Sequence, residues 1–213
     1  MSHIEMKQSS AEELLNALTH GLGALLAVVG TIVMLIHTRN TGDVWSIWSA
    51  IIFGLSMILL YSASAAYHIT KTPRIKSVLR VIDHCSIFIL IVGSYAPFCL
   101  VLLRGISGFI LFSANLLLGT LGIVLNAISL KRFRIFSMIC YLLMGWSTIV
   151  LIKPMITLMS PAGLWLLLAG GLSYTVGVLF YSLKKIRFMH MVWHFFVLAG
   201  SILHFWCILR YVF

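Results

Sequence analysis

Long apolar runs, separated by short polar segments, make up almost the whole chain. Each run is about 20 residues or longer, the length that an α-helix needs to cross the hydrocarbon core of a bilayer. A transmembrane β-barrel would instead show short segments of alternating apolar and polar residues, which the chain lacks. The pattern therefore predicts seven transmembrane helices, at about residues 14–37, 44–69, 79–103, 106–129, 133–152, 161–182 and 188–211.

Composition agrees with this fold class. Of the 213 residues, 61% are hydrophobic and only 9% are charged, whereas soluble domains are about half apolar and about a quarter charged. A water-soluble protein is therefore excluded. We expect one all-α domain over residues 1–213, a polytopic bundle of seven helices preceded by a short N-terminal segment, 1–13. The four cysteines fall inside apolar runs and form no CxxC pair, so neither a thiolate metal site nor a disulfide framework is indicated.

Basic residues outnumber acidic residues by 15 to 5, and the formal net charge is +10. They lie in the short loops between runs, which indicates anionic membrane lipids rather than nucleic acid as partners. If the loops alternate between two sides, the side of the N-terminus collects eleven of them: Lys7, Lys71, Arg74, Lys76, Arg80, Lys131, Arg132, Arg134, Lys184, Lys185 and Arg187. The other side keeps four: Arg39, Arg104, Lys153 and Arg210. Because cytoplasmic loops are rich in Lys and Arg, the N-terminus is predicted to be cytoplasmic and the C-terminus outside.

Ionisable side chains inside membrane helices are rare and usually functional. Asp83 is the only acidic residue that we place inside an apolar run, since the glutamates near the N-terminus are expected to precede the first helix. At about 1.5 Å of rise per residue, His68, Asp83, His190 and His194 fall within about ten ångströms of one membrane depth. These side chains come from three predicted helices and lie near their cytoplasmic ends.

His190 and His194 are four residues apart, the spacing at which zinc-binding histidines share one face of a helix. Ser64 and His68 have the same spacing on the second predicted helix. Three neutral imidazoles would leave a fourth zinc position for a water molecule, whose pKa zinc lowers to about 7. Asp83 would hold that water or act as its base, and Ser64 would support the ligands or contact the substrate.

Single histidines near helix ends have another interpretation, because an imidazole there often reaches the lipid headgroups. We expect this of His37, and both interpretations stay open for His20 and His84. His204 lies ten residues beyond His194, about 15 Å deeper along the helix. It is therefore excluded as a ligand of the same ion.

Four motifs together resemble the hemolysin III branch of the progestin and adipoQ receptor family, which also contains the adiponectin receptors. The motifs are Glu13-Leu-Leu-Asn16-Ala-Leu-Thr19-His20, then Ser64-x-x-x-His68, then Asp83 followed by Gly93-Ser94-Tyr95-Ala96-Pro97, and last His190-x-x-x-His194 with His204-Phe205. The resemblance covers nearly the whole chain. It implies seven transmembrane helices with a cytoplasmic N-terminus, in the inner membrane of a bacterium.

The resemblance also implies a site. Its zinc ligands would be His68, His190 and His194, Asp83 would contact the zinc-bound water, and Ser64 would be the hydroxyl of its motif. The family belongs to a wider group of membrane hydrolases that resemble alkaline ceramidases. The resemblance therefore implies hydrolysis of a lipid amide. The receptor-type N-terminal extension is missing, which implies a minimal bacterial member.

Other functions stay open at this stage. A cytolysin or pore former is suggested by the name of the bacterial branch, although a bundle with so few charged residues makes a poor aqueous channel. A receptor or sensor would hold zinc in a purely structural role, in a coordinatively closed site. A proton or ion transporter would have only Asp83 and His84 as relay groups.

Overall fold

The computed structural model describes residues 8–183 and 185–213, and α-helices dominate them. The α-helices are α1 (Ser10–Arg39), α2 (Val44–Ile69), α3 (Pro73–Pro97), α4 (Ile106–Trp146), α5 (Ile152–Leu158), α6 (Pro161–Ser182) and α7 (Met189–Tyr211). A π-helical segment, η1 (Phe98–Leu102), follows α3, and a 3-10 segment, η2 (Ser147–Leu151), follows α4. Within the described ranges, six helical stretches are long and apolar enough to cross a membrane. The all-α, multi-pass membrane architecture is confirmed.

The first helix begins earlier than the apolar pattern predicts. The Ser9 hydroxyl accepts a hydrogen bond from the Glu12 backbone N–H, and the Glu12 carboxylate accepts one from the Ser9 N–H. This reciprocal capping box starts α1 at Ser10. Glu12 and Glu13 consequently lie inside the helix, and the expectation that they precede it was wrong. Lys7 and Lys184, which entered the predicted charge asymmetry, lie outside the described residues.

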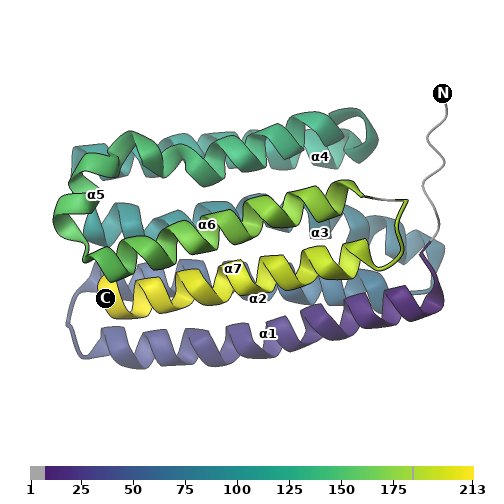
Figure 1. The fold of residues 1–213 in the computed structure, drawn as a ribbon, viewed down its shortest axis with the longest axis horizontal. Helices are drawn as coiled ribbons and strands as arrows, with labels where there is room; N and C mark the ends of the chain where they lie inside the picture. Colours follow the sequence, from purple (N-terminus) through teal and green to yellow (C-terminus); the bar gives the residue numbers. More distant parts are fainter. Residues whose placement is uncertain (1–7, 184) are drawn as a thin grey trace.

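The element α4 contains a reversal of the chain at Ser129, whose backbone is not helical (φ −166°, ψ 103°). Asn126 donates a hydrogen bond to Tyr141, and Ser137 donates one to Asn126. Farther from the turn, the Asn115 amide donates to the Ser147 hydroxyl over 2.9 Å. These pairs match an antiparallel hairpin, whose two arms lie side by side in Figure 1. The 53-residue stretch Ile106–Leu158, which contains both arms, is one of the six stretches that are long and apolar enough to cross a membrane. Seven separate membrane spans therefore stay a prediction.

The helices pack as a layered bundle (Figure 1). Helix α2 packs between α1 and α3, α7 packs against α6 and α1, and the α4 hairpin packs against α3. The start of α1, the α2–α3 turn, the Ser129 turn and the α6–α7 loop lie at one end of the bundle, and the C-terminus lies at the other. Gly122 lets α4 approach α3 closely, because a Cβ there would overlap the Phe88 ring.

An ion pair joins two loops at the end that holds the C-terminus. Arg104 donates a hydrogen bond of 2.6 Å to Asp43, which also caps α2 through Ser46. Although partial burial acts to raise the pKa of Asp43, the hydrogen bonds from Arg104 and Ser46 lower that pKa below its usual value. The pair connects the α1–α2 loop to the start of the α4 hairpin.

Candidate metal centre

Three imidazoles from α2 and α7 converge at the end of the bundle where α1 begins. One ring nitrogen from each of His68, His190 and His194 lies within 4.8 Å of the other two. His68 Nε2 and His190 Nε2 are 3.2 Å apart. The structure therefore brings together the three histidines that the sequence predicted as metal ligands.

A carboxylate on helix α1 binds the Nδ1 atom of His68. The Nδ1 of His68 donates a hydrogen bond of 2.8 Å to the Glu13 carboxylate, whose other oxygen lies 3.0 Å from Lys76 Nζ. Because Nδ1 carries the proton of the neutral ring, the Nε2 atom keeps its lone pair and faces His190. A carboxylate behind a histidine is the usual arrangement around metal ligands, since it fixes the ring and its tautomer.

His194 is oriented in the same way by a hydroxyl of α1. The Thr19 hydroxyl donates its own proton to the Asn16 carbonyl, so its oxygen accepts from His194 Nδ1 over 3.1 Å. The proton of the neutral His194 ring is then on Nδ1, which leaves the Nε2 lone pair unused. This Nε2 is fully buried and has no hydrogen-bond partner among the described residues.

The residues of the cluster could hold a metal ion such as zinc. Two nitrogens at the Zn–N distance of about 2.05 Å in a tetrahedral site are separated by about 3.3 Å, and the His68 and His190 Nε2 atoms are 3.2 Å apart. Buried polar atoms normally find a partner, because an unpaired one loses its hydration. His194 belongs to the cluster, and its buried Nε2 would be satisfied by a shared cation.

The two predicted catalytic residues lie beside this cluster rather than within it. Asp83, on α3, is 4% exposed and interacts with Ser64 and Arg80. Ser64 is fully buried, one helical turn before His68, and its hydroxyl makes no hydrogen bond of good geometry with the described residues. Ser64 is therefore near the Asp83 carboxylate and on the same face of α2 as His68.

Helix α1 contributes more to the site than the sequence motifs predict. Glu13 and Thr19 were quoted only as parts of a motif, and their partners across the bundle were not foreseen. His20 is also buried, and its ring stacks on that of His194, with centroids 3.4 Å apart and planes 10° from parallel. A sequence signal exists in the i, i+3, i+7 spacing of Glu13, Asn16 and His20 at the start of an apolar helix, with Thr19 next to His20.

The remaining histidines lie elsewhere. His37 is exposed near the end of α1, as expected of an interfacial residue. His84 is half-buried and donates a hydrogen bond from Nδ1 to the Arg80 carbonyl. His204 is buried deeper along α7, where its Nε2 donates to the Leu167 carbonyl.

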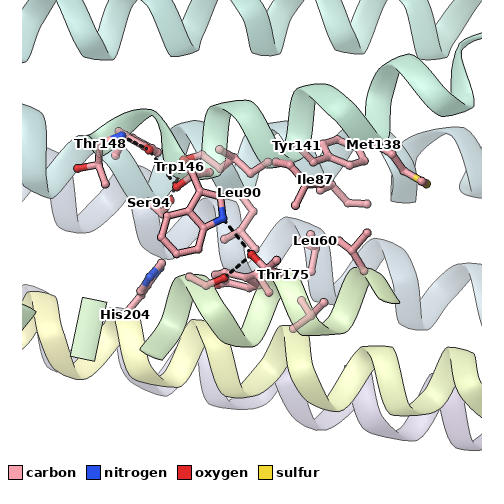
Figure 2. A pocket seen from close by; sticks show the side chains of 18 of the residues that line it. Leu60, Ile87, Leu90, Ser94, Met138, Tyr141, Trp146, Thr148, Thr175 and His204 are labelled. Atoms are coloured by element: carbon pink, nitrogen blue, oxygen red, sulfur yellow. Dashed lines mark hydrogen bonds between the residues drawn. The ribbon is translucent and has the colours of Figure 1, made fainter. Parts of the chain in front are cut away.

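A cavity of about 1420 Å³ runs along the bundle; His68, His190 and His194 do not belong to its described wall, but His20 and Trp193, whose rings contact that of His194, do. Asp83, His20 and Trp193 belong to its wall near the cluster, and His204 lies farther along it. Figure 2 shows Leu60, Ile87 and Leu90 along this wall, with Trp146 reaching across to donate a hydrogen bond to Thr175. An apolar cavity with a few polar groups is the usual form of a small-molecule site.

Comparisons with known proteins assign the family. The family model for haemolysin-III related proteins matches residues 8–205. The chain is 44% identical over 200 residues to the hemolysin-3 homolog of Bacillus subtilis, covering 94% of each chain. It is 40% identical over 207 residues to hemolysin-3 of Bacillus cereus, covering 97% of this chain and 94% of the relative. Similarity extends to the human monocyte to macrophage differentiation factor, at 28% identity over 215 residues, covering 97% and 87% of the two chains. The resemblance drawn from the motifs is confirmed: the chain belongs to the haemolysin-III related family of membrane proteins.

Proposed function

We propose that this protein is an intramembrane zinc-dependent hydrolase that acts on the amide bond of a lipid. The observation that carries the proposal is the convergence of three imidazoles, two of which have partners on Nδ1 that leave their Nε2 lone pairs available. Imidazole nitrogens are preferred zinc ligands, and three of them leave zinc open to substrate or water.

The residues divide the work between holding the ion and moving a proton. His68, His190 and His194 would hold zinc, while Glu13 and Thr19 keep two of the rings in their binding tautomer. Bound zinc would supply Lewis acidity, polarising a carbonyl and lowering the pKa of water. Asp83 would accept a proton from the attacking water and return it to the leaving amine. Ser64, near Asp83 and on the same face of α2 as His68, would orient the Asp83 carboxylate or the substrate carbonyl.

The position of the site supports a lipid substrate. The cavity beside the cluster is walled mainly by apolar side chains, and the bundle has several helices that can cross a bilayer. Burial of a lipid chain in the cavity would contribute about 0.8 kcal/mol per methylene group only if the chain came from water. The selectivity of the site for one lipid over another must therefore come from the polar groups near the cluster. An amide is proposed because the motifs resemble those of alkaline ceramidase-like hydrolases.

A seven-pass topology with a cytoplasmic N-terminus forms part of this proposal. Each arm of the α4 hairpin is about 20 residues long, which is enough to cross the hydrocarbon core. Seven passes agree with the opposite placement of the start of α1 and the C-terminus in Figure 1. The loops at the end of the cluster carry most of the basic residues, so this end would face the cytoplasm.

A turnover assay tests the hydrolase. Purified protein in nonionic detergent is given an N-acyl sphingoid lipid, and release of the fatty acid is followed. Release is expected from the wild type and from His37→Ala, and no release from His194→Ala. Zinc-containing wild type that cleaves no member of an N-acyl lipid panel would overturn the hydrolase and favour a sensor with structural zinc. Dye leakage from vesicles without lipid cleavage would favour a pore former.

A further inference from the structure

Cationic side chains gather where the large cavity meets the Ser129 turn. Arg80, Lys131 and Arg134 belong to the wall of the cavity of about 1420 Å³. Asp83 is the only carboxylate among the described residues of that wall, and it lies close enough to Arg80 to interact with it. The polar end of an otherwise apolar cavity therefore carries a positive excess.

A second cavity, of about 590 Å³, continues this charge. It shares Arg80, Asn126 and Leu130 with the first cavity, so the two adjoin at the α3–α4 boundary. Its wall adds Lys71 and Lys76, the latter already paired with Glu13, and no carboxylate from the described part of the chain. The two walls together present five Lys and Arg side chains against one carboxylate.

Only some of the basic residues in this region border the two cavities. Arg132 lies in sequence between Lys131 and Arg134, yet it belongs to neither wall and lies instead over the Phe133 ring. Arg74 is likewise outside both walls, although Lys71 and Lys76 belong to one. All these basic side chains except the half-buried Lys76 are exposed, and only some of them border the cavities, so Arg74 and Arg132 serve as matched controls.

Beyond the cationic end, the large cavity is lined mainly by aliphatic and aromatic side chains, among them Leu90, Ile91, Leu142 and Leu164. A cavity with a cationic end and an apolar body is complementary to an amphiphile with an anionic head and a long chain. Arg and Lys bind carboxylate and phosphate oxygens through charge-assisted hydrogen bonds, and Arg80, Lys131 and Arg134 are exposed at the cavity rim, where an entering head group can reach them. The apolar body would hold the chain.

We propose that the ligand of this cavity is a long-chain amphiphile with a carboxylate or phosphate head, and that Arg80, Lys131 and Arg134 bind the head. This proposal rests on the proposed function in one respect, that the cavity is the substrate site. It narrows the substrate class to lipids that carry an anionic group near the bond to be cleaved. The histidine cluster is not needed to hold the head.

Fluorescence binding to the full-length protein in nonionic detergent tests the proposal. The probes are 11-(dansylamino)undecanoic acid and its methyl ester, which share the chain and differ in the head. Wild type is expected to bind the acid about tenfold more tightly than the ester, as two charge-assisted hydrogen bonds allow. The double variant Arg80→Gln/Arg134→Gln should reduce this preference to about threefold or less. Its unchanged affinity for the ester would show that the cavity is still formed.

Two controls separate the possible causes of a preference for the acid. The matched double variant Arg74→Gln/Arg132→Gln removes the same charge outside the cavities and should keep the preference. His194→Ala should also keep it, because the head is bound by cations of the protein and not by a metal. A preference lost in His194→Ala but kept in Arg80→Gln/Arg134→Gln would overturn the proposal and assign the head to the metal centre. An equal loss in both double variants would overturn it in favour of general surface charge.

Inorganic phosphate tests whether the cationic end takes a free anion. At the concentration of the probe, phosphate is not expected to displace the acid, because it lacks the chain that the apolar body buries. Complete displacement by phosphate would contradict the assignment to an amphiphile. Absence of zinc, or of turnover, leaves these binding outcomes unchanged, so the two proposals fail separately.

Discussion

The Nδ1 of His68 lies 2.8 Å from the Glu13 carboxylate, so a residue of the first helix sets the tautomer of a ring on the second. Glu13 in turn contacts Lys76 at the start of α3, which gives the carboxylate a fixed place between three helices. Glu12, its neighbour, accepts a hydrogen bond from the Phe188 N–H just before α7. The start of α1 therefore holds both helices that carry the clustered histidines.

Removal of the Glu13 carboxylate should weaken metal binding without abolishing it. Loss of such a partner behind a ligand typically costs about 10–100-fold in affinity, and we expect this range for Glu13→Ala in competition with a zinc chelator. Glu13→Gln keeps an acceptor for His68 and should fall between wild type and Glu13→Ala. Asp43→Asn, at the other end of the bundle, is the control and should bind zinc as wild type does. Wild-type zinc affinity in Glu13→Ala would remove Glu13 from the site.

Asp83→Asn should separate catalysis from metal binding. Asparagine keeps the size of the side chain but accepts no proton, so lipid cleavage should be lost while most of the zinc is retained. The measurement is zinc content and fatty acid release on the same preparation. Normal turnover by this variant would exclude Asp83 from the mechanism, and loss of the metal together with activity would make it part of the ion's binding site.

The Asp43–Arg104 pair predicts a stability difference that depends on pH. The pKa of Asp43 is lowered in the folded protein, so the pair stabilises above the ordinary aspartate pKa of about 4 and this contribution is lost as pH falls through the lowered value. Asp43→Asn keeps an acceptor for Ser46 and should unfold at a slightly lower temperature at pH 7, in line with about 0.2–1 kcal/mol for an exposed pair. Its unfolding temperature should approach that of wild type as pH falls through the lowered pKa of Asp43. A difference that is equal at both pH values would contradict the role of the ion pair.

Cysteine labelling tests the hairpin and the orientation together. The four native cysteines are buried, so they should react little with an impermeant maleimide. Thr41→Cys and Arg132→Cys place exposed thiols in the α1–α2 loop and near the Ser129 turn. Intact cells should label position 41, and position 132 should react only after permeabilisation. Labelling of both positions from outside would show that the first arm of the hairpin does not cross the membrane.

The apolar runs predicted the helices well, because a membrane helix must be apolar over its whole length and cannot pair with a distant strand. They placed the start of α1 too late, since the capping box of Ser9 and Glu12 is a polar signal outside the run. They also separated residues 106–129 from 133–152, on either side of the Ser129 reversal.

The histidine cluster was predictable because four-residue spacing fixes a shared helix face and depth follows from helical rise. The partners Glu13 and Thr19 were not, because they depend on how α1 is rotated against α2 and α7. That rotation is set by packing, for example by Gly23 against the Tyr61 ring, and no local pattern reports it. The stacking of His20 on His194 has the same origin.

Metal analysis of purified protein tests the central claim most directly. We expect about one zinc ion per wild-type chain, most of it lost in His68→Ala and His194→Ala, and none lost in His37→Ala, whose side chain is exposed and distant from the cluster. Because zinc would cross-link α2 and α7, the two depleted variants should also unfold at a lower temperature, and added zinc should not restore them. Equal zinc in wild type, His68→Ala and His194→Ala would contradict the metal centre described here.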